Sequence, residues 1–268
     1  MGIGDEVMAS GMARGALARG KRIAFGDGTR IIWGLYGDMV FRGNPNVARP
    51  GDEGAPDIEW NHFYQGHRTY VRPIRGKNWE FNDSFRATPG ELFFSATEDA
   101  MLDHIRHGFV VIDPNVAKKD SAINKQWPRE RYEAIAAMII AAGHRVVQFV
   151  SPDAPYHLEN RTDAILTVNW RAAASLLRAA KLWIGPEGGM HHTAAALGIP
   201  AVVLFGAWIH PRTTGYPLHE NIYVGDEKPC GALKPCAHCR EAMSKITVED
   251  VIEAAERATT MRKGANRC

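Results

Sequence analysis

The chain has 268 residues, enough for one large domain or two smaller ones, and 45% of them are hydrophobic, so a substantial core can form. The net charge of +2 is too small to indicate a nucleic-acid-binding protein, and no apolar run approaches the roughly 20 residues of a membrane span. The N-terminus also lacks the basic flank and apolar core of a secretory signal. We therefore expect a soluble, cytoplasmic protein with no nucleic-acid partner and no transmembrane segment.

The first half of the chain predicts short elements separated by turns. Residues 2–6 (GIGDE) indicate a glycine turn, and residues 8–20 (MASGMARGALARG) a helix. Short strands are expected at 22–25, 31–33, 39–41 and 57–60. Residues 43–86 are rich in Gly, Pro, Asn, Arg and aromatic residues, and for most of this region the weak periodicity gives no confident element. A helix over 98–107 closes this half.

The second half shows clearer patterns. Residues 109–112 (FVVI) are a continuous apolar run, which is typical of a fully buried strand. Pro128, at a tolerated first-turn position, opens a helix to about residue 142, and Gly143 ends it. Further strands are expected at 145–150, 164–167, 181–184 and 201–206, with helices at 171–180 and 190–197.

This alternation of strands and helices predicts an α/β fold, a parallel sheet with helices on both faces. Ligands of such sheets bind beyond the carboxyl ends of the strands. The loops after residues 112, 150 and 184 all open on that edge, so we expect the functional site there.

The most informative segment is the glycine-rich turn at 185–189 and the helix that follows it. Glycines allow close backbone approach to a ligand, and a helix start offers unpaired N–H groups that suit a phosphate. An ordinary strand–helix turn with packed histidines would give the same pattern. Because Glu187, His191 and His192 cluster within these few residues, we favour a seat for a diphosphate or sugar phosphate.

Three further residues have a plain and a functional interpretation. Lys125, in the loop before a helix, is either a solvated surface lysine or a point charge for a phosphate. The local sequence around Asp5 favours the role of a helix N-cap over that of a general base. Arg212 lies in the loop HPRTTG. This loop is equally well interpreted as an ordinary polar loop or as one that contacts a charged ligand.

Three of the four cysteines, Cys230, Cys236 and Cys239, lie within ten residues. A metal site with His238 or His210 as the fourth ligand is one interpretation. The spacing C-x5-C-x2-C is not a standard zinc pattern, so a packed cysteine turn or a labile disulfide is favoured. Cys268 is expected to be a free thiol.

Several motifs resemble those of the heptosyltransferase-like glycosyltransferases of family 9. Residues 184–206, IGPEGGMHHTAAALGIPAVVLFG, match the family's pattern of a strand, a glycine-rich acidic turn, a histidine, AAALG-x-P and a strand ending LFG. The family's Lys-x-Trp-Pro loop occurs at 125–128, and its Gly-Asp ahead of a helix at 4–5. The cysteine pattern followed by Ile-Thr and a final helix occurs as CAHCREAMSKITVEDVIEA.

The resemblance implies a GT-B fold of two Rossmann-like domains with parallel sheets. Residues 1–107 would form a reduced, acceptor-side domain, and residues 108–268 the nucleotide-sugar-binding domain. The family's strand before Gly-Asp is missing here, which implies either a misplaced start codon or a fold that tolerates its loss.

The resemblance also implies roles for individual residues. Asp5 would be the catalytic base that deprotonates the acceptor hydroxyl. The residues that would bind the donor or its phosphates are Lys125, Glu187, Gly188, Gly189, His192 and Arg212. Glu187 stands where the family usually has Asp, and Gly188 where it has Thr, so one hydroxyl contact is lost and the carboxylate reaches further.

We therefore predict an inverting, metal-independent glycosyltransferase that moves a sugar from a nucleotide-diphosphate sugar to a hydroxyl of a glycan or another acceptor. No Asp-x-Asp pair that would hold a metal on the diphosphate is present, and no cofactor is expected. Fixed positive groups must then stabilise the leaving diphosphate. A nucleotide-sugar-binding protein without turnover is the alternative, and a small zinc module on residues 230–239 is the least favoured hypothesis.

Overall fold

The structure of this protein is a computed structural model, and it describes residues 1–74, 76, 78–151 and 154–265. The N-terminal part contains α1 (Ile3–Gly11), α2 (Ala13–Leu17), β1 (Arg22–Phe25), α3 (Gly37–Val40), β2 (Ile58–Asn61), β3 (Val71–Ile74), β4 (Asn78–Phe81), α4 (Ala96–Ala100) and the 3-10 helix η1 (Met101–His104). The rest contains β5 (Phe109–Ile112), α5 (Asp120–Ile123), α6 (Arg129–Ala141), β6 (Val146–Val150), β7 (Asp163–Leu166), α7 (Trp170–Leu177), β8 (Ala180–Pro186), α8 (Gly189–Ala196), β9 (Ala201–Gly206), α9 (Pro211–Thr214), β10 (His219–Tyr223), α10 (Ala237–Lys245) and α11 (Val248–Ala265).

A six-stranded sheet forms the centre of the molecule, with the strand order β10-β9-β8-β5-β6-β7. Every neighbouring pair in it is parallel. The predicted α/β fold with a parallel sheet is therefore confirmed. The strand order reverses between the neighbouring strands β5 and β8. In sheets of this kind, ligands bind next to that point.

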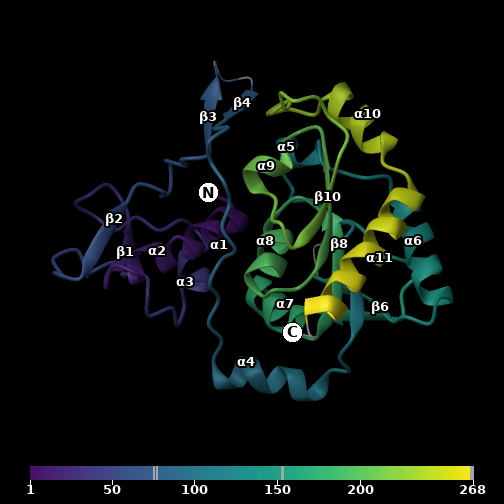
Figure 1. Cartoon of the computed structure of the whole chain (residues 1–268), viewed down its shortest axis with the longest axis horizontal. Helices are drawn as coiled ribbons and strands as arrows, with labels where there is room; N and C mark the ends of the chain where they lie inside the picture. The colour runs from purple at the N-terminus through teal and green to yellow at the C-terminus, as the bar shows by residue number, and fades with distance from the viewer. Residues whose placement is uncertain (75, 77, 152–153, 266–268) are drawn as a thin grey trace.

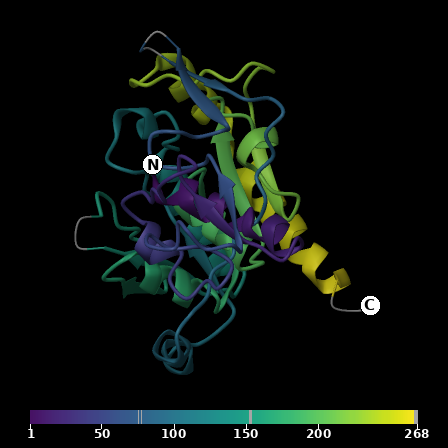
Figure 2. The ribbon, with the colours of Figure 1, turned by 90° about the vertical axis from the view of Figure 1, so that its left-hand side faces the viewer.

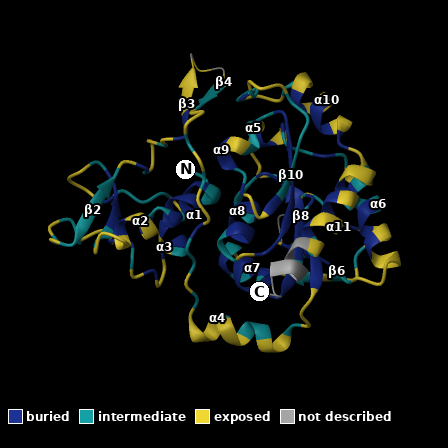
Figure 3. Ribbon diagram, in the orientation of Figure 1, coloured by how far each residue is buried: buried dark blue, intermediate teal, exposed yellow. Residues whose placement is uncertain are grey.

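The inner strands β5, β6, β8 and β9 are buried on both faces because their side chains alternate between two hydrophobic clusters. Phe109 and Val111 pack with α1, α7 and α8 on one face. Val110 and Ile112 pack with α6, α10 and α11 on the other. Figure 3 shows the centre of the sheet, at β8, as buried, while α4, which runs along the edge of the molecule, is largely exposed.

The N-terminal part lies against the α8 face of the sheet, as Figures 1 and 2 show from two directions. It contains the parallel pair β1–β2 and the antiparallel hairpin β3–β4. Its helix α1 packs on α8, and Val7 and Met8 join the same hydrophobic cluster as Phe109 and Val111. One continuous core thus connects the N-terminal part to the sheet.

The glycine turn expected at residues 2–6 is wrong, because α1 already begins at Ile3. Gly4 lies inside the helix, where a Cβ atom would come within 2.6 Å of the His192 ring and 3.4 Å of the Gly189 Cα atom. The glycine is therefore required by the close approach of two helices and not by a turn.

Two short strand predictions are also wrong. Residues 31–33 form only an isolated bridge, at Ile31, and residues 39–41 overlap α3. Apolar runs of this length do not distinguish a strand from a buried helical turn. The hairpin β3–β4 and strand β10 were not predicted. Among the described residues, every helix is too short or too polar to span a bilayer.

Candidate functional site

Two adjoining cavities open at the carboxyl edge of the sheet, close to the point where the strand order reverses. The larger, of about 450 Å³, extends over the ends of β5 and β6 to the start of α7. The smaller, of about 230 Å³, reaches the turn between β8 and α8. Both cavities are lined by Asp113, Asn115, Val116, Ala117, Trp170, Trp183 and Met190. The sequence-based placement of the site at this edge is consistent with these cavities.

The shared lining includes residues that the sequence analysis did not single out. Asp113 directly follows β5, and burial raises the pKa of its carboxyl to about 6. The Asn115 backbone N–H donates a hydrogen bond to it at 3.2 Å. Trp170 and Trp183 supply apolar walls. The position of Asp113 immediately after the FVVI run was the available signal, because the loop after that strand was expected to face the site.

Lys125 and Glu187 form a buried ion pair in the smaller cavity. The Lys125 Nζ atom donates to Glu187 Oε2 at 2.7 Å and lies 4.9 Å from the centroid of the Trp208 ring. Burial alone would raise the pKa of the Glu187 carboxyl, but the Lys125 ammonium and His192 hold it well below its usual range. The structure thus brings together two residues that lie 62 positions apart.

The two histidines of α8 are buried behind this pair. The Nδ1 atom of His192 is hydrogen-bonded to the Tyr216 hydroxyl at 2.7 Å. Its Nε2 atom lies 3.6 Å from Glu187 Oε1. His191 Nε2 donates to the Thr214 carbonyl at 3.0 Å, and the Gly188 N–H donates to His191 Nδ1 at 3.3 Å. Burial, and next the neighbouring His192, lower the pKa of His191 well below its ordinary value.

Glu187, His191 and His192 have ligand atoms close enough to hold a metal ion. Both ring nitrogens of His191 are occupied by hydrogen bonds, however, so this ring has no free lone pair for a metal. This triplet is therefore a hydrogen-bonded support for the turn and not a preformed metal site.

The start of α8 lines the smaller cavity. Gly188 and Gly189 line it together with Ile3 of α1. A Cβ atom on Gly189 would lie 2.5 Å from the Ile3 side chain, so this position admits only glycine without a shift of the neighbouring helix. The two predicted glycines thus lie at the helix start, in the cavity that contains Lys125 and Glu187.

Asp5 lies two residues beyond Ile3, in the first turn of α1, with its side chain 7% exposed. Its carboxylate accepts hydrogen bonds from the Gly2 N–H and the Tyr70 hydroxyl, each at 2.6 Å, and lies 3.7 Å from the Arg68 guanidinium. The expected N-cap role of Asp5 is therefore wrong, because Gly2 is the N-cap residue; Asp5 is the third residue of the helix and caps it by accepting the Gly2 N–H. Burial, and next the Asp5 charge, raise the pKa of Tyr70 well above its ordinary value.

Two predicted binding residues, His192 and Arg212, lie outside the lining of both cavities. Arg212 is also far more exposed than His192. It is on the short helix α9, where its side chain is 39% exposed and lies 3.8 Å from the Asp83 carboxylate. The structure thus groups Lys125, Glu187, Gly188 and Gly189 in one cavity, with His192 behind Glu187, and leaves Arg212 at the surface.

The family model of glycosyltransferase family 9 (heptosyltransferase) matches residues 88–246. A comparison with curated protein sequences gives no match. Among solved structures, a family 9 glycosyltransferase from Veillonella parvula aligns over 97% of this chain and 95% of its own, with 14% identity and a TM-score of 0.64. This likeness supports the predicted GT-B fold.

Two Escherichia coli proteins are also similar. TibC, an iron-containing dodecameric glycosyltransferase from an enterotoxigenic strain, aligns over 66% of this chain and 50% of its own, with 20% identity and a TM-score of 0.51. The ADP-heptose lps heptosyltransferase II aligns over 65% of this chain and 54% of its own, with 21% identity and a TM-score of 0.48. The chain thus spans about half the length of these two proteins.

Proposed function

Since this chain belongs to glycosyltransferase family 9 (heptosyltransferase), we propose that it transfers a sugar from a nucleotide-diphosphate sugar to an acceptor hydroxyl. The transfer would invert the configuration at the anomeric carbon and need no metal at the diphosphate. The observation that carries the proposal is the pair of adjoining cavities at the carboxyl edge of the sheet, which end at a buried ammonium and a helix start.

The larger cavity suits the nucleoside of the donor. Its walls include the apolar rings of Trp170 and Trp183, against which a nucleobase can pack. Asp113 and Asn115, at the junction of the two cavities, offer polar groups for ribose or sugar hydroxyls. A volume of about 450 Å³ lies within the usual range of small-ligand sites.

The smaller cavity suits the diphosphate. An ammonium has three donors, and the contact with Glu187 uses one of those of Lys125, so the same group can also meet a phosphate oxygen. The N–H groups at the start of α8 and its helix dipole face the same space, beside Gly188 and Gly189. These fixed positive groups would stabilise the charge that develops on the leaving diphosphate.

Asp5 would accept the proton of the acceptor hydroxyl as that oxygen attacks the anomeric carbon. Its hydrogen bonds with Tyr70 and Gly2 fix the orientation of the carboxylate. Because Asp5 is nearly covered, α1 would have to shift from α8 to admit an acceptor and return to exclude water. On this proposal residues 1–107 act as the acceptor-side domain and residues 108–268 as the donor-binding domain.

A nucleotide-sugar-binding protein without turnover is the second candidate. The observation that favours it is that both hydrogen bonds of the Asp5 carboxylate are structural, one to the helix start and one to Tyr70. The two candidates share the donor site and differ only in what Asp5 does.

The test begins with a thermal-shift screen of nucleoside diphosphates and nucleotide sugars, because specific binding raises stability by mass action. Donors that bind are incubated with hydroxyl acceptors, and released nucleotide is detected by mass spectrometry. Lys125→Met should weaken donor binding at least tenfold in calorimetry, whereas Lys245→Met, at an exposed lysine outside both cavities, should leave it unchanged. Equal affinity of the two variants would refute the role of Lys125.

Asp5→Asn keeps the shape of the side chain and removes the base. We expect turnover to fall at least a hundredfold while donor affinity survives. Turnover at the unaltered rate would exclude Asp5 as the base. Donor binding with no transfer to any acceptor by the unaltered protein would support the binding-only candidate.

A further inference from the structure

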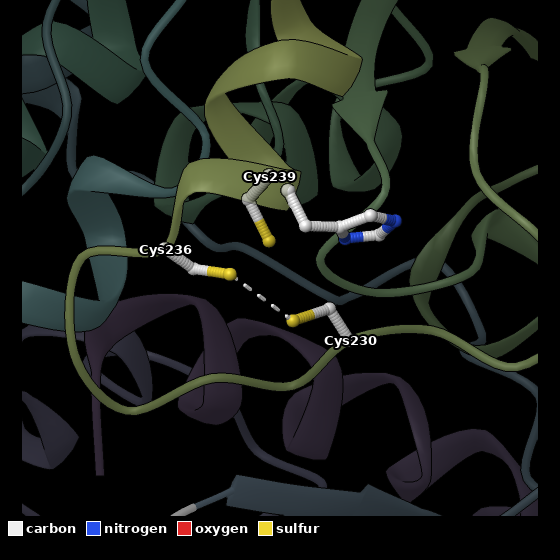
Figure 4. Close-up of side chains that lie close together, drawn as sticks. Cys230, Cys236 and Cys239 are labelled. Atoms are coloured by element: carbon white, nitrogen blue, oxygen red, sulfur yellow. Dashed lines mark hydrogen bonds between the residues drawn. The ribbon is translucent and has the colours of Figure 1, made fainter.

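A second cluster of reactive side chains lies between β10 and α10. Cys230 is in the loop after β10, and Cys236, His238 and Cys239 lie at the start of α10. Each of the four offers one ligand atom, and these atoms all lie within 4.8 Å of one another. Figure 4 shows the three sulfur atoms pointing into one small space.

The distance between the sulfur atoms distinguishes a metal site from a disulfide. The Sγ atoms of Cys230 and Cys236 are 3.8 Å apart, and all three cysteines are free thiols. A disulfide needs about 2.05 Å between its sulfur atoms. Sulfur ligands at about 2.3 Å from a tetrahedral metal ion are about 3.8 Å from each other. The observed separation therefore matches one edge of a coordination tetrahedron.

The residue types narrow the choice of metal. Three thiolates and one imidazole are soft or borderline ligands, which favour zinc over calcium and magnesium, since those ions require oxygen. Four protein ligands complete a tetrahedron and leave no position for a substrate or an activated water. We propose that Cys230, Cys236, His238 and Cys239 bind one structural zinc ion. The nonstandard spacing does not prevent this, because the loop returns Cys230 to the start of α10.

The loop that carries these ligands is attached to the segment before Lys125. Asn124, which is 2% exposed, accepts a hydrogen bond from the Cys236 N–H at 2.8 Å. Its amide donates to the carbonyls of Ala232 and Lys234 at 3.0 and 2.9 Å. One buried side chain thus holds the loop between two of the metal ligands at three points.

Trp208 forms a second connection between the loop and Lys125. Its Nε1 donates to the Ala232 carbonyl at 2.8 Å, and the Lys125 ammonium lies 4.9 Å from the centroid of its ring. Phe81 of the β3–β4 hairpin contacts the same ring edge-on, with centroids 5.6 Å apart.

The hairpin is also hydrogen-bonded to the loop itself. The Trp79 N–H donates to the Gly231 carbonyl at 2.7 Å, and the Asn78 side chain donates to the Cys230 carbonyl at 3.1 Å. A zinc ion in this position would fix the loop at the contact between the N-terminal hairpin and the segment that carries Lys125. Its influence on the donor site through Lys125 rests on the proposed function, whereas the metal site does not.

The first measurement is the metal content of the purified full chain, grown with added zinc and analysed by mass spectrometry of the elements. We expect one zinc ion per chain, and replacement by Co²⁺ should give the visible absorption of tetrahedral thiolate-bound cobalt. His238→Asn and Cys236→Ser should each reduce bound zinc at least fivefold, whereas the matched control Cys268→Ser should keep it. Because His238 is exposed, its replacement removes no core packing, so this variant remains informative if Cys236→Ser does not fold.

Three outcomes would overturn the proposal: substoichiometric zinc after reconstitution, a disulfide between these cysteines in freshly purified protein, or iron in place of zinc. Hydrogen exchange tests the connection to Lys125 without any donor. Removal of zinc should speed exchange at least tenfold in residues 230–236 and in residues 120–126. Faster exchange in the first segment alone would refute the connection. None of these results depends on transferase activity, so failure of the metal site and failure of the proposed function are distinguishable.

Discussion

The contact between α1 and α8 gives the sharpest test of the arrangement described above. In Gly4→Ala the added Cβ atom would lie 2.6 Å from the His192 Cδ2 atom. This ring cannot move freely, since it is 2% exposed and hydrogen-bonded to Tyr216. Either the ring or α1 must therefore shift, and overpacking of this kind costs about 1–3 kcal/mol of folding free energy.

The control is Gly15→Ala, at an exposed position of the short helix α2. There the nearest atom to the added Cβ is the flexible end of Arg19, at 3.7 Å. Alanine in place of a helical glycine stabilises by about 0.5–1 kcal/mol where space allows. After this gain is subtracted from the overpacking cost, we expect Gly4→Ala to be less stable than the unaltered protein by up to about 2 kcal/mol.

Urea unfolding followed by circular dichroism measures both variants. Equal stabilisation by the two substitutions would refute the close packing of α1 on α8. On the proposed function, Gly4→Ala should also lower turnover more than donor affinity, because the shift displaces Asp5 while Lys125 and Glu187 stay in place.

Two further predictions concern buried charges. Burial raises the pKa of Glu6 from 4.5 to about 7, so between these pH values the folded state holds a proton that the unfolded state releases. The free energy of unfolding should therefore fall by about 3 kcal/mol as the pH rises from about 4.5 to 7. Glu6→Gln should remove this fall in urea unfolding at several pH values, and an unchanged pH profile of the variant would contradict the prediction. Arg171 is buried against Glu98 and donates to the carbonyls of Met39 and Phe93. Arg171→Met should lower the free energy of unfolding by about 3–5 kcal/mol, because it leaves Glu98 without its buried partner. Arg257→Met, at an exposed ion pair, should lower it by at most about 1 kcal/mol. Similar losses for both variants in urea unfolding would refute the importance of burial.

The central sheet could be predicted well because its inner strands are visible in the sequence as short apolar runs. The run FVVI predicted β5 to the residue, since a strand buried on both faces is apolar throughout. The glycine-rich turn after β8 was found for a similar reason, because close backbone approach leaves glycines in the sequence.

The site could be predicted only in part, because its partners are set by tertiary contacts. Nothing near Asp5 in the sequence indicates Tyr70, which lies 65 residues away in a region of weak periodicity. Asp113 is a single acidic residue in a loop, and only its burial in the folded chain changes its pKa. Arg212 was chosen for its charge and its loop, but α9 carries it away from the cavities.

The core that joins α1 to the sheet has a consequence for how the protein melts. Val7 and Met8 share one apolar cluster with Phe109 and Val111, so neither half can lose its packing without exposing the other. Heat or denaturant should therefore disrupt both halves in a single cooperative transition. Any opening that admits a substrate must be a small, local movement of one helix, made while the rest of the interior stays dry.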